Sequence, residues 1–182
     1  FSVSCNIRTP FAFTGVHQIF SFADENVAEN YWGLYVDASG DLNMIRRTSA
    51  TESDIDTGFD LEEDTNYHIV GVWDSATTAT VYVNGVSVYA ATGLASILMS
   101  SAFDKLLFGY LRVVSAAYFW NGEISNLKVF NVSLSATEVK ELYSGASVPF
   151  KYKGANQTLL NTGTATNVSS VFDSFSGASA TG

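Results

Sequence analysis

The dipeptide Asn84-Gly85 constrains the fold more than any other feature of the sequence, because valine-rich segments flank it on both sides. Asn-Gly is the preferred pair for a two-residue type I′ hairpin turn, in which both central residues have positive φ. So short a turn fixes the register of the two strands. The predicted pairs are Val83–Val86, Tyr82–Ser87, Val81–Val88 and Thr80–Tyr89. We therefore expect one face of the hairpin to carry four inward valines, at 81, 83, 86 and 88.

Further strands are predicted from apolar alternation and from the turn residues between them. Tyr67–Trp73 is apolar on nearly both faces, as a central strand is. The other predicted strands are Phe1–Arg8, His17–Ala23, Tyr31–Val36, Asp41–Ile45, a short one near Ile55–Leu61, Lys105–Tyr110 and Tyr118–Phe130. An irregularity near Ser125-Asn126 would turn Ile124, Leu127 and Val129 inward.

Only one helix is predicted. Ser135 and Glu138 have the spacing of a capping box, and Gly145 provides a C-terminal stop near Tyr143. Many short strands and a single helix indicate an all-β protein built as a two-sheet antiparallel sandwich.

The composition changes after Pro149. We expect residues 1–148 to form the sandwich, and residues 149–182, rich in Asn, Thr, Ser and Gly, to be a linker and the start of a further, truncated β segment. Because the sequence begins within a strand, we expect it to be part of a longer protein. We also expect an additional strand beside Ile124–Phe130, supplied by upstream sequence, by residues 156–175 or by a neighbouring chain.

Several segments together resemble the laminin-G-like, concanavalin-A-like family. Tyr67-His68, a polar loop and Val81–Gly85 (VYVNG) are similar to two of its strands. Phe119–Ile124, Leu127–Asn131, Leu134–Glu138 and Leu142–Gly145 are similar to its closing strand and terminal helix. Phe1–Arg8 is similar to an early strand. The resemblance covers residues 1–146 and implies a jelly-roll sandwich with one short C-terminal helix, but no particular activity.

Charge narrows the range of partners. The chain has nine basic and eighteen acidic residues, a net charge of −9, which argues against nucleic acid and anionic membrane surfaces as partners. No apolar run reaches the length of a membrane span, so we expect no membrane insertion. Cys5 is the single cysteine, so an intrachain disulfide cannot form, and a buried free thiol is expected.

The sequence favours a protein that is not an enzyme. Some relatives are glycosidases with paired carboxylates on a strand, whereas the acidic runs at Asp24-Glu25, Asp54–Asp56 and Asp60–Asp64 are predicted to lie in loops. The two histidines, His17 and His68, show no spacing typical of a catalytic triad. No cofactor is predicted. Calcium is the one metal considered, with Asp24 and Asn26 as candidate ligands, since it accepts oxygen ligands from loops.

Sugar recognition requires aromatic faces beside polar groups. We expect the loops Asp24–Trp32 and Tyr110–Asn121 to supply both at one rim. The candidate ligand-binding residues are Asn30, Tyr31, Trp32, Tyr110, Arg112, Trp120 and Asn121. In the competing interpretation, Trp32 and Trp120 lie in the core and these loops make subunit contacts.

The predicted function is a non-catalytic binding or adhesion module that recognises a glycan or cell-surface receptor. The Leu134–Glu138 ending, the few lysines and the Ser/Thr/Gly-rich tail resemble such modules in bacteriophage structural proteins. We therefore expect a location on a virion surface, as a capsid decoration or tail fibre, or outside the cell. Two alternatives stay open: a decoration domain that contacts other subunits of an assembly, and a carbohydrate-binding module of a secreted glycoside hydrolase.

Overall fold

The structure is a computed structural model that describes residues 1–24, 30–48, 51–75, 77–94, 105–113 and 115–145. The side chains of residues 30, 48, 51–52, 112–113 and 115–116 fall outside this description. Contacts within the chain define two units, Phe1–Ala146 and Ser147–Gly182. The predicted second β segment, within residues 149–182, lies outside the described residues.

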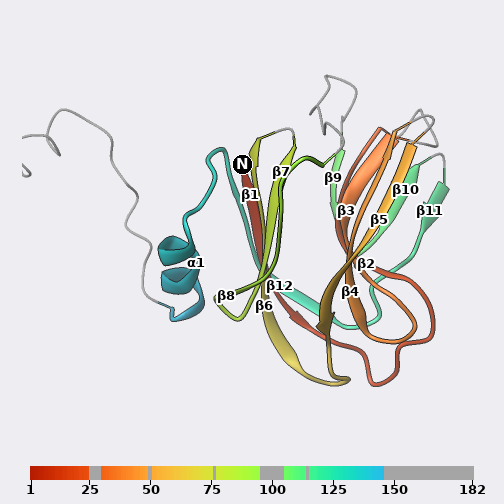
Figure 1. Cartoon of the computed structure of the whole chain (residues 1–182). Coiled ribbons are helices and arrows are strands. Elements are labelled where there is room, and N and C mark those ends of the chain that lie inside the picture. The colour runs from red at the N-terminus through yellow and green to blue at the C-terminus, as the bar shows by residue number, and fades with distance from the viewer. Residues whose placement is uncertain (25–29, 49–50, 76, 95–104, 114, 146–182) are drawn as a thin grey trace, which may run out of the picture. The chain divides into compact units, whose positions relative to one another are not determined.

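Two five-stranded sheets face each other, and all neighbouring strands are antiparallel (Figure 1). The first sheet has the order β12 (Glu123–Phe130), β1 (Ser2–Arg8), β6 (Asn66–Ser75), β7 (Thr78–Val83) and β8 (Val86–Ala91). The second has the order β5 (Thr51–Asp60), β4 (Asp41–Thr48), β3 (Asn30–Val36), β2 (His17–Ala23) and β9 (Lys105–Phe108). The predicted two-sheet antiparallel jelly-roll sandwich is confirmed.

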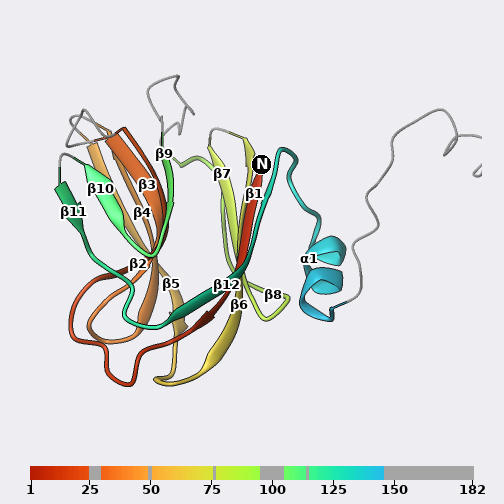
Figure 2. The same ribbon diagram turned by 180° about the vertical axis from the view of Figure 1, so that it is seen from behind.

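Two smaller elements lie on the outer sides of the sandwich. A hairpin of β10 (Leu111–Val113) and β11 (Ser115–Ala117) lies outside the second sheet (Figure 2), between two segments that were predicted as strands. Helix α1 (Ala136–Tyr143) lies outside the first sheet. No helix among the residues that the structure describes has the length and apolar character to cross a membrane.

The central hairpin forms the predicted turn. Asn84 and Gly85 have φ angles of 50° and 78°, and Val83–Val86 and Tyr82–Ser87 pair as expected. Beyond them the register shifts, so that Val81 faces Tyr89 instead of Val88. The extra residue forms a bulge that brings Tyr89 against the core. The prediction that Val86 points inward is wrong, since its side chain is 65% exposed. Strand β8 is the outermost strand of its sheet and has β7 as its neighbour on one side only, so less of it is covered.

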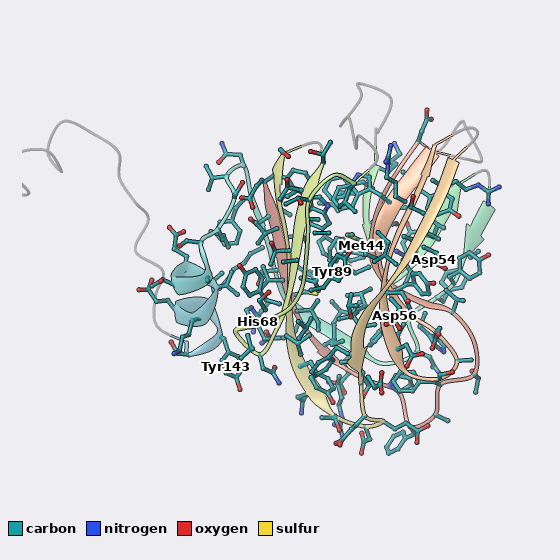
Figure 3. All side chains as sticks on the ribbon, viewed as in Figure 1. Met44, Asp54, Asp56, His68, Tyr89 and Tyr143 are labelled. Carbon is teal, nitrogen blue, oxygen red and sulfur yellow. The ribbon has the colours of Figure 1, made fainter. Side chains whose placement is uncertain are left out.

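Aromatic rings fill the space between the sheets. Trp32 of β3 is fully buried, with its ring centroid 4.3 Å from Phe22 and 4.2 Å from Trp73. The ring of Trp73 lies over Gly71, where an added Cβ would come within 2.3 Å of it. Met44 and Tyr89 also point into this space (Figure 3). Strand β6, buried from Tyr67 to Trp73, is the central strand that the sequence predicted.

Helix α1 has the predicted capping box: Glu138 N donates to Ser135 Oγ, and Ser135 N donates to Glu138 Oε2. Its apolar face covers part of the outer side of the first sheet. The residues of this contact are Val70, Val72, Tyr82, Phe130, Leu134, Val139 and Leu142. The predicted helix is therefore confirmed, and Val139 and Leu142 lie on its inward face.

Two expectations about the outer strands are wrong. Asp54, Asp56 and Asp60 lie on β5, which is longer than predicted, and not in loops. The irregularity in β12 is present, with Asn126 at φ 52°, but Leu127 and Val129 are 47% and 53% exposed. Only Ile124 packs against the core. Strand β12 is the outermost strand of its sheet in the described part of the chain, so the expected additional neighbour stays a prediction.

Candidate functional site

The segment 110–121 reaches both ends of β2. Leu111 packs with Ala23 and Tyr31 near the end of the strand that Asp24 follows. Tyr118 lies at the other end, because Gln18 N, near the strand's start, donates to Tyr118 O at 2.9 Å. Seven residues of strand separate the two ends by roughly 20 Å. Asn26 and the side chains of Asn30 and Arg112 lie outside the described part of the structure.

Two of the aromatic residues that were predicted to bind a ligand are buried. Trp32 belongs to the core, because its position on β3 points between the sheets, so it offers no ring face to a ligand. Tyr31, the next residue in the opposite direction, is 7% exposed and packs with Ala23 and Leu111 beneath β10. The sequence alone does not show that both faces of β3 are covered, so Tyr31 and Trp32 could not be distinguished from exposed aromatic residues.

An exposed group of aromatic residues remains on the 110–121 segment. The rings of Tyr110 and Phe119 stack, with centroids 5.9 Å apart and planes at 18°. Phe119 is 60% exposed and Tyr118 48%, whereas Trp120 is half-buried and packs against the core. Asn121 beside them is exposed. We call Tyr110, Tyr118, Phe119, Trp120 and Asn121 the aromatic surface.

Hydrogen bonds from β2 and β9 hold the backbone of the aromatic surface. Ser21 Oγ donates to Tyr110 O at 3.0 Å, and Trp120 N donates to Gly109 O at 2.7 Å. His17 Nδ1 lies 2.9 Å from Phe119 O, and since a carbonyl only accepts, Nδ1 carries the proton. Tyr118 has a φ of 57°, an uncommon conformation for a side chain of this size. The surface is therefore pre-organised.

The outer face of the first sheet holds a polar cleft of 560 Å³ that the sequence did not predict as a site. Side chains opposite the core-facing positions of β1, β6 and β12 form its floor, and the end of α1 forms a wall. The floor rows are Asn6, His68 and Ser125, then Arg8, Asn66 and Glu123. The alternation of polar and apolar residues in β1 indicates one polar face. The sequence around β1 does not indicate that β6 and β12 are its neighbours, so the cleft could not be predicted from it.

A buried pair lies in this floor. Ser4 Oγ is 2.9 Å from His68 Nε2, and the two residues are 2% and 9% exposed. Burial, followed by the positive charge of Lys128, lowers the pKa of His68, so its imidazole is neutral near neutral pH. Nδ1 of His68 has no hydrogen-bond partner among the described residues. In the described part of the chain, no carboxylate hydrogen-bonds this imidazole as in a catalytic triad.

Carboxylates gather on the second sheet. Asp54 and Asp56 stand two residues apart on β5 (Figure 3), but Asp54 accepts a hydrogen bond from the Tyr35 hydroxyl, at 2.7 and 2.6 Å to its two oxygens. A hydrogen bond with Asp60 raises the pKa of Asp41, and burial and the charges of Asp37, Asp60 and Asp56 add to the effect. Within the described residues, no three His, Cys, Asp or Glu side chains gather as metal ligands. Of the two predicted calcium ligands, Asp24 and Asn26, the structure describes Asp24, and this residue is buried.

Comparisons with known proteins identify the family and the fold. Residues 1–140 match the family described as the concanavalin A-like lectin/glucanases superfamily. No curated protein matches the chain.

Solved structures of similar fold share little sequence with the chain. A CBM40 domain of the Ruminococcus gnavus IT-sialidase, bound to α2,3-sialyllactose, is 15% identical with a TM-score of 0.65, over 78% of this chain and 81% of that one. Domain 4 of a GH43 extracellular arabinanase from Geobacillus stearothermophilus, in complex with arabinotriose, is 20% identical with a TM-score of 0.65, over 78% and 65%. A SAP-like pentraxin from Limulus polyphemus is 20% identical with a TM-score of 0.55, over 78% and 68%.

Proposed function

The chain belongs to the concanavalin A-like lectin/glucanases superfamily, and on that premise we propose that it is a non-catalytic module that binds carbohydrate. The observation that carries the proposal is the stacked pair of Tyr110, which is half-buried, and Phe119, which is 60% exposed. Stacked rings present a flat apolar face to the C–H groups of a pyranose, while the Asn121 amide can bond its hydroxyls. The sugars bound to two of the similar structures support the same class of ligand.

The proposed surface keeps part of the predicted site. Tyr110, Trp120 and Asn121 stay in it, Phe119 and Tyr118 join it, and Trp32 leaves it because its ring is buried. Arg112 follows Leu111 in β10, close in sequence to Tyr110, and is retained as a proposed polar contact. Calcium binding at Asp24 and Asn26 is proposed separately from this surface.

A glycan array probed with the full chain tests the proposal, followed by calorimetry on the glycans retained. Tyr110→Ala and Phe119→Ala should each weaken binding by about tenfold or more, equivalent to ~1.4 kcal/mol. Val86→Ser, which changes an exposed apolar side chain on the other sheet, is the matched control and should bind as the wild type does. Binding that survives both aromatic substitutions would remove this surface from consideration.

Two contexts suit such a module: the surface of a virion, as a decoration or fibre domain, and an extracellular glycoside hydrolase that carries it as a binding domain. Purifying the native protein from its source and identifying what accompanies it separates the two. In either context we propose that the module hydrolyses no polysaccharide. Product release from laminarin, agar or alginate that depends on one Asp or Glu would refute this.

A second candidate function is contact with other subunits of an assembly. Exposed apolar side chains along and after β12 favour it: Leu127, Val129 and Val132 are 47%, 53% and 48% exposed. Light scattering after size-exclusion chromatography tests the idea. A Leu127→Lys, Val129→Lys double variant should dissociate any oligomer, and a wild-type monomer at high concentration would exclude self-assembly through this strand.

A further inference from the structure

We propose that the polar cleft on the outer face of the first sheet is a second saccharide site, which takes an uncharged sugar. The proposal goes beyond the function assigned to the aromatic surface and does not depend on it. The cleft is formed by β1, β6, β12 and α1, whereas the aromatic surface is held by β2 and β9 of the other sheet. The module would then engage two sugars through separate contacts.

The floor of the cleft offers the groups that hydroxyls pair with. Asn6, Asn66 and Asn126 line it with planar amides, each able to donate and accept, and Ser125 adds a hydroxyl. Strand register holds them in place, since Asn6 stands between His68 and Ser125 on neighbouring strands. Groups fixed by a sheet lose little freedom when a ligand binds.

The wall supplies an apolar face. Tyr143, at the end of α1, stacks on His68 with centroids 6.0 Å apart and planes at 23° (Figure 3). It also lines the cleft and is 50% exposed, so part of its ring is free for the C–H groups of a sugar. Aromatic surface beside convergent amides is the combination that a saccharide requires.

The balance of charge selects an uncharged ligand. Lys128 and Glu123 both line the cleft, and Arg8 is bound to Asp64, with 2.7 Å between Nη2 and Oδ1. Two cations and two anions leave no net charge, in a chain whose net charge is −9. A charged sugar would be attracted by one of Lys128 and Glu123 and repelled by the other, so the lining gives it no net electrostatic gain over a neutral sugar.

The size of the cleft also suits a saccharide. The cleft volume of 560 Å³ falls within the ~300–1,000 Å³ typical of small-molecule sites.

The test is an amide-resolved NMR titration of the full chain. The neutral probes are glucose, galactose, mannose and N-acetylglucosamine with their β-linked disaccharides, and the acidic probes are galacturonic and N-acetylneuraminic acid. We expect a neutral probe to shift the amides of β1, β6 and β12. Asn66→Ala and Tyr143→Leu should weaken that response at least tenfold, and Tyr110→Ala, the matched control at the aromatic surface, should leave it unchanged. Melting curves verify that each variant folds.

The proposal is overturned if no neutral probe shifts the cleft amides, or if an acidic probe binds there more tightly. It is also overturned if Tyr110→Ala abolishes the cleft response, because the two surfaces would then be one site. Failure here leaves the aromatic surface intact, since that proposal is judged by Tyr110→Ala and Phe119→Ala on the array.

Discussion

The imidazole of His68 lies against the ring of Tyr143, which joins the central strand of the first sheet to the last turn of α1. The turn of the central hairpin belongs to the same contact. Asn84 Oδ1 accepts a hydrogen bond from His68 N at 2.9 Å, and Gly85 lies beside Tyr143. Turn, strand and helix therefore support one another where the polar cleft is formed.

A methyl group at position 85 should disturb this contact. Gly85 has a φ of 78°, and an added Cβ would be 3.2 Å from Tyr143 Cβ and Cδ1. Gly85→Ala should lower the free energy of unfolding by more than the about 1–2 kcal/mol that a positive φ alone costs. Gly93→Ala is the matched control, since φ is 74° and nothing lies within 4 Å. Urea unfolding of both variants measures the difference, and equal losses would argue against the contact with Tyr143.

Gly71 should tolerate no side chain. An added Cβ would come within 2.3 Å of Trp73 Cη2 and 3.3 Å of Phe20 Cζ, so the packed rings would have to move. Gly71→Ala should cost about 1–3 kcal/mol or more, as overpacking does. Gly15→Ala, where nothing lies within 4 Å, should stay within about 0.5 kcal/mol of the wild type. Similar thermal unfolding midpoints for the two variants would contradict the close contact between Gly71 and the Trp73 ring.

Cys5 should be unreactive in the native state. It is fully buried, and burial raises its pKa to about 12 from 9.0. A thiol reagent should modify it only as fast as the protein unfolds. Because the folded pKa is the higher one, the related stability is present below pH 9 and is lost as pH rises towards 12, by up to about 1.4 kcal/mol per pH unit. Cys5→Ala should lack this part of the pH dependence, and rapid native labelling would refute the burial.

The carboxylates around Asp41 should destabilise the fold at neutral pH. Its pKa is raised, so the stability linked to its proton is present below the ordinary value of 3.8 and is lost as pH rises through the folded value. Asp41→Asn removes one charge facing Asp37, Asp56 and Asp60. The melting temperature should rise at pH 7 and change little at pH 3. A rise of equal size at both pH values would mean that charge is not the cause.

Local patterns predicted most of the fold. The Asn84-Gly85 turn and the Ser135–Glu138 box are chemistry within a few residues, and both formed as expected. The bulge in β8 and the exposure of Leu127 depend instead on which strand ends a sheet, which neighbouring residues do not specify.

The candidate site was less accessible to sequence reasoning. Trp32 and Tyr110 are both aromatic residues two positions from a polar one, Asn30 and Arg112, yet one fills the core and the other is half exposed beside Phe119. Ser4 and His68 form a pair only because β1 and β6 are neighbours. A site assembled across strands appears in the sequence as scattered polar residues, and the polar cleft was therefore missed.

The irregular outer strands affect how readily the protein aggregates when many copies are close together. Pairing shifts in β12, β8 and β5, and β9 has only four residues, so no outer strand in the described part of the chain offers a long unbroken row of backbone groups. A strand from another molecule would need a matching kink to continue the ladder. One further strand fitted to the kink in β12 can still pair there, whereas the repeated in-register stacking of a fibril is disfavoured at these edges.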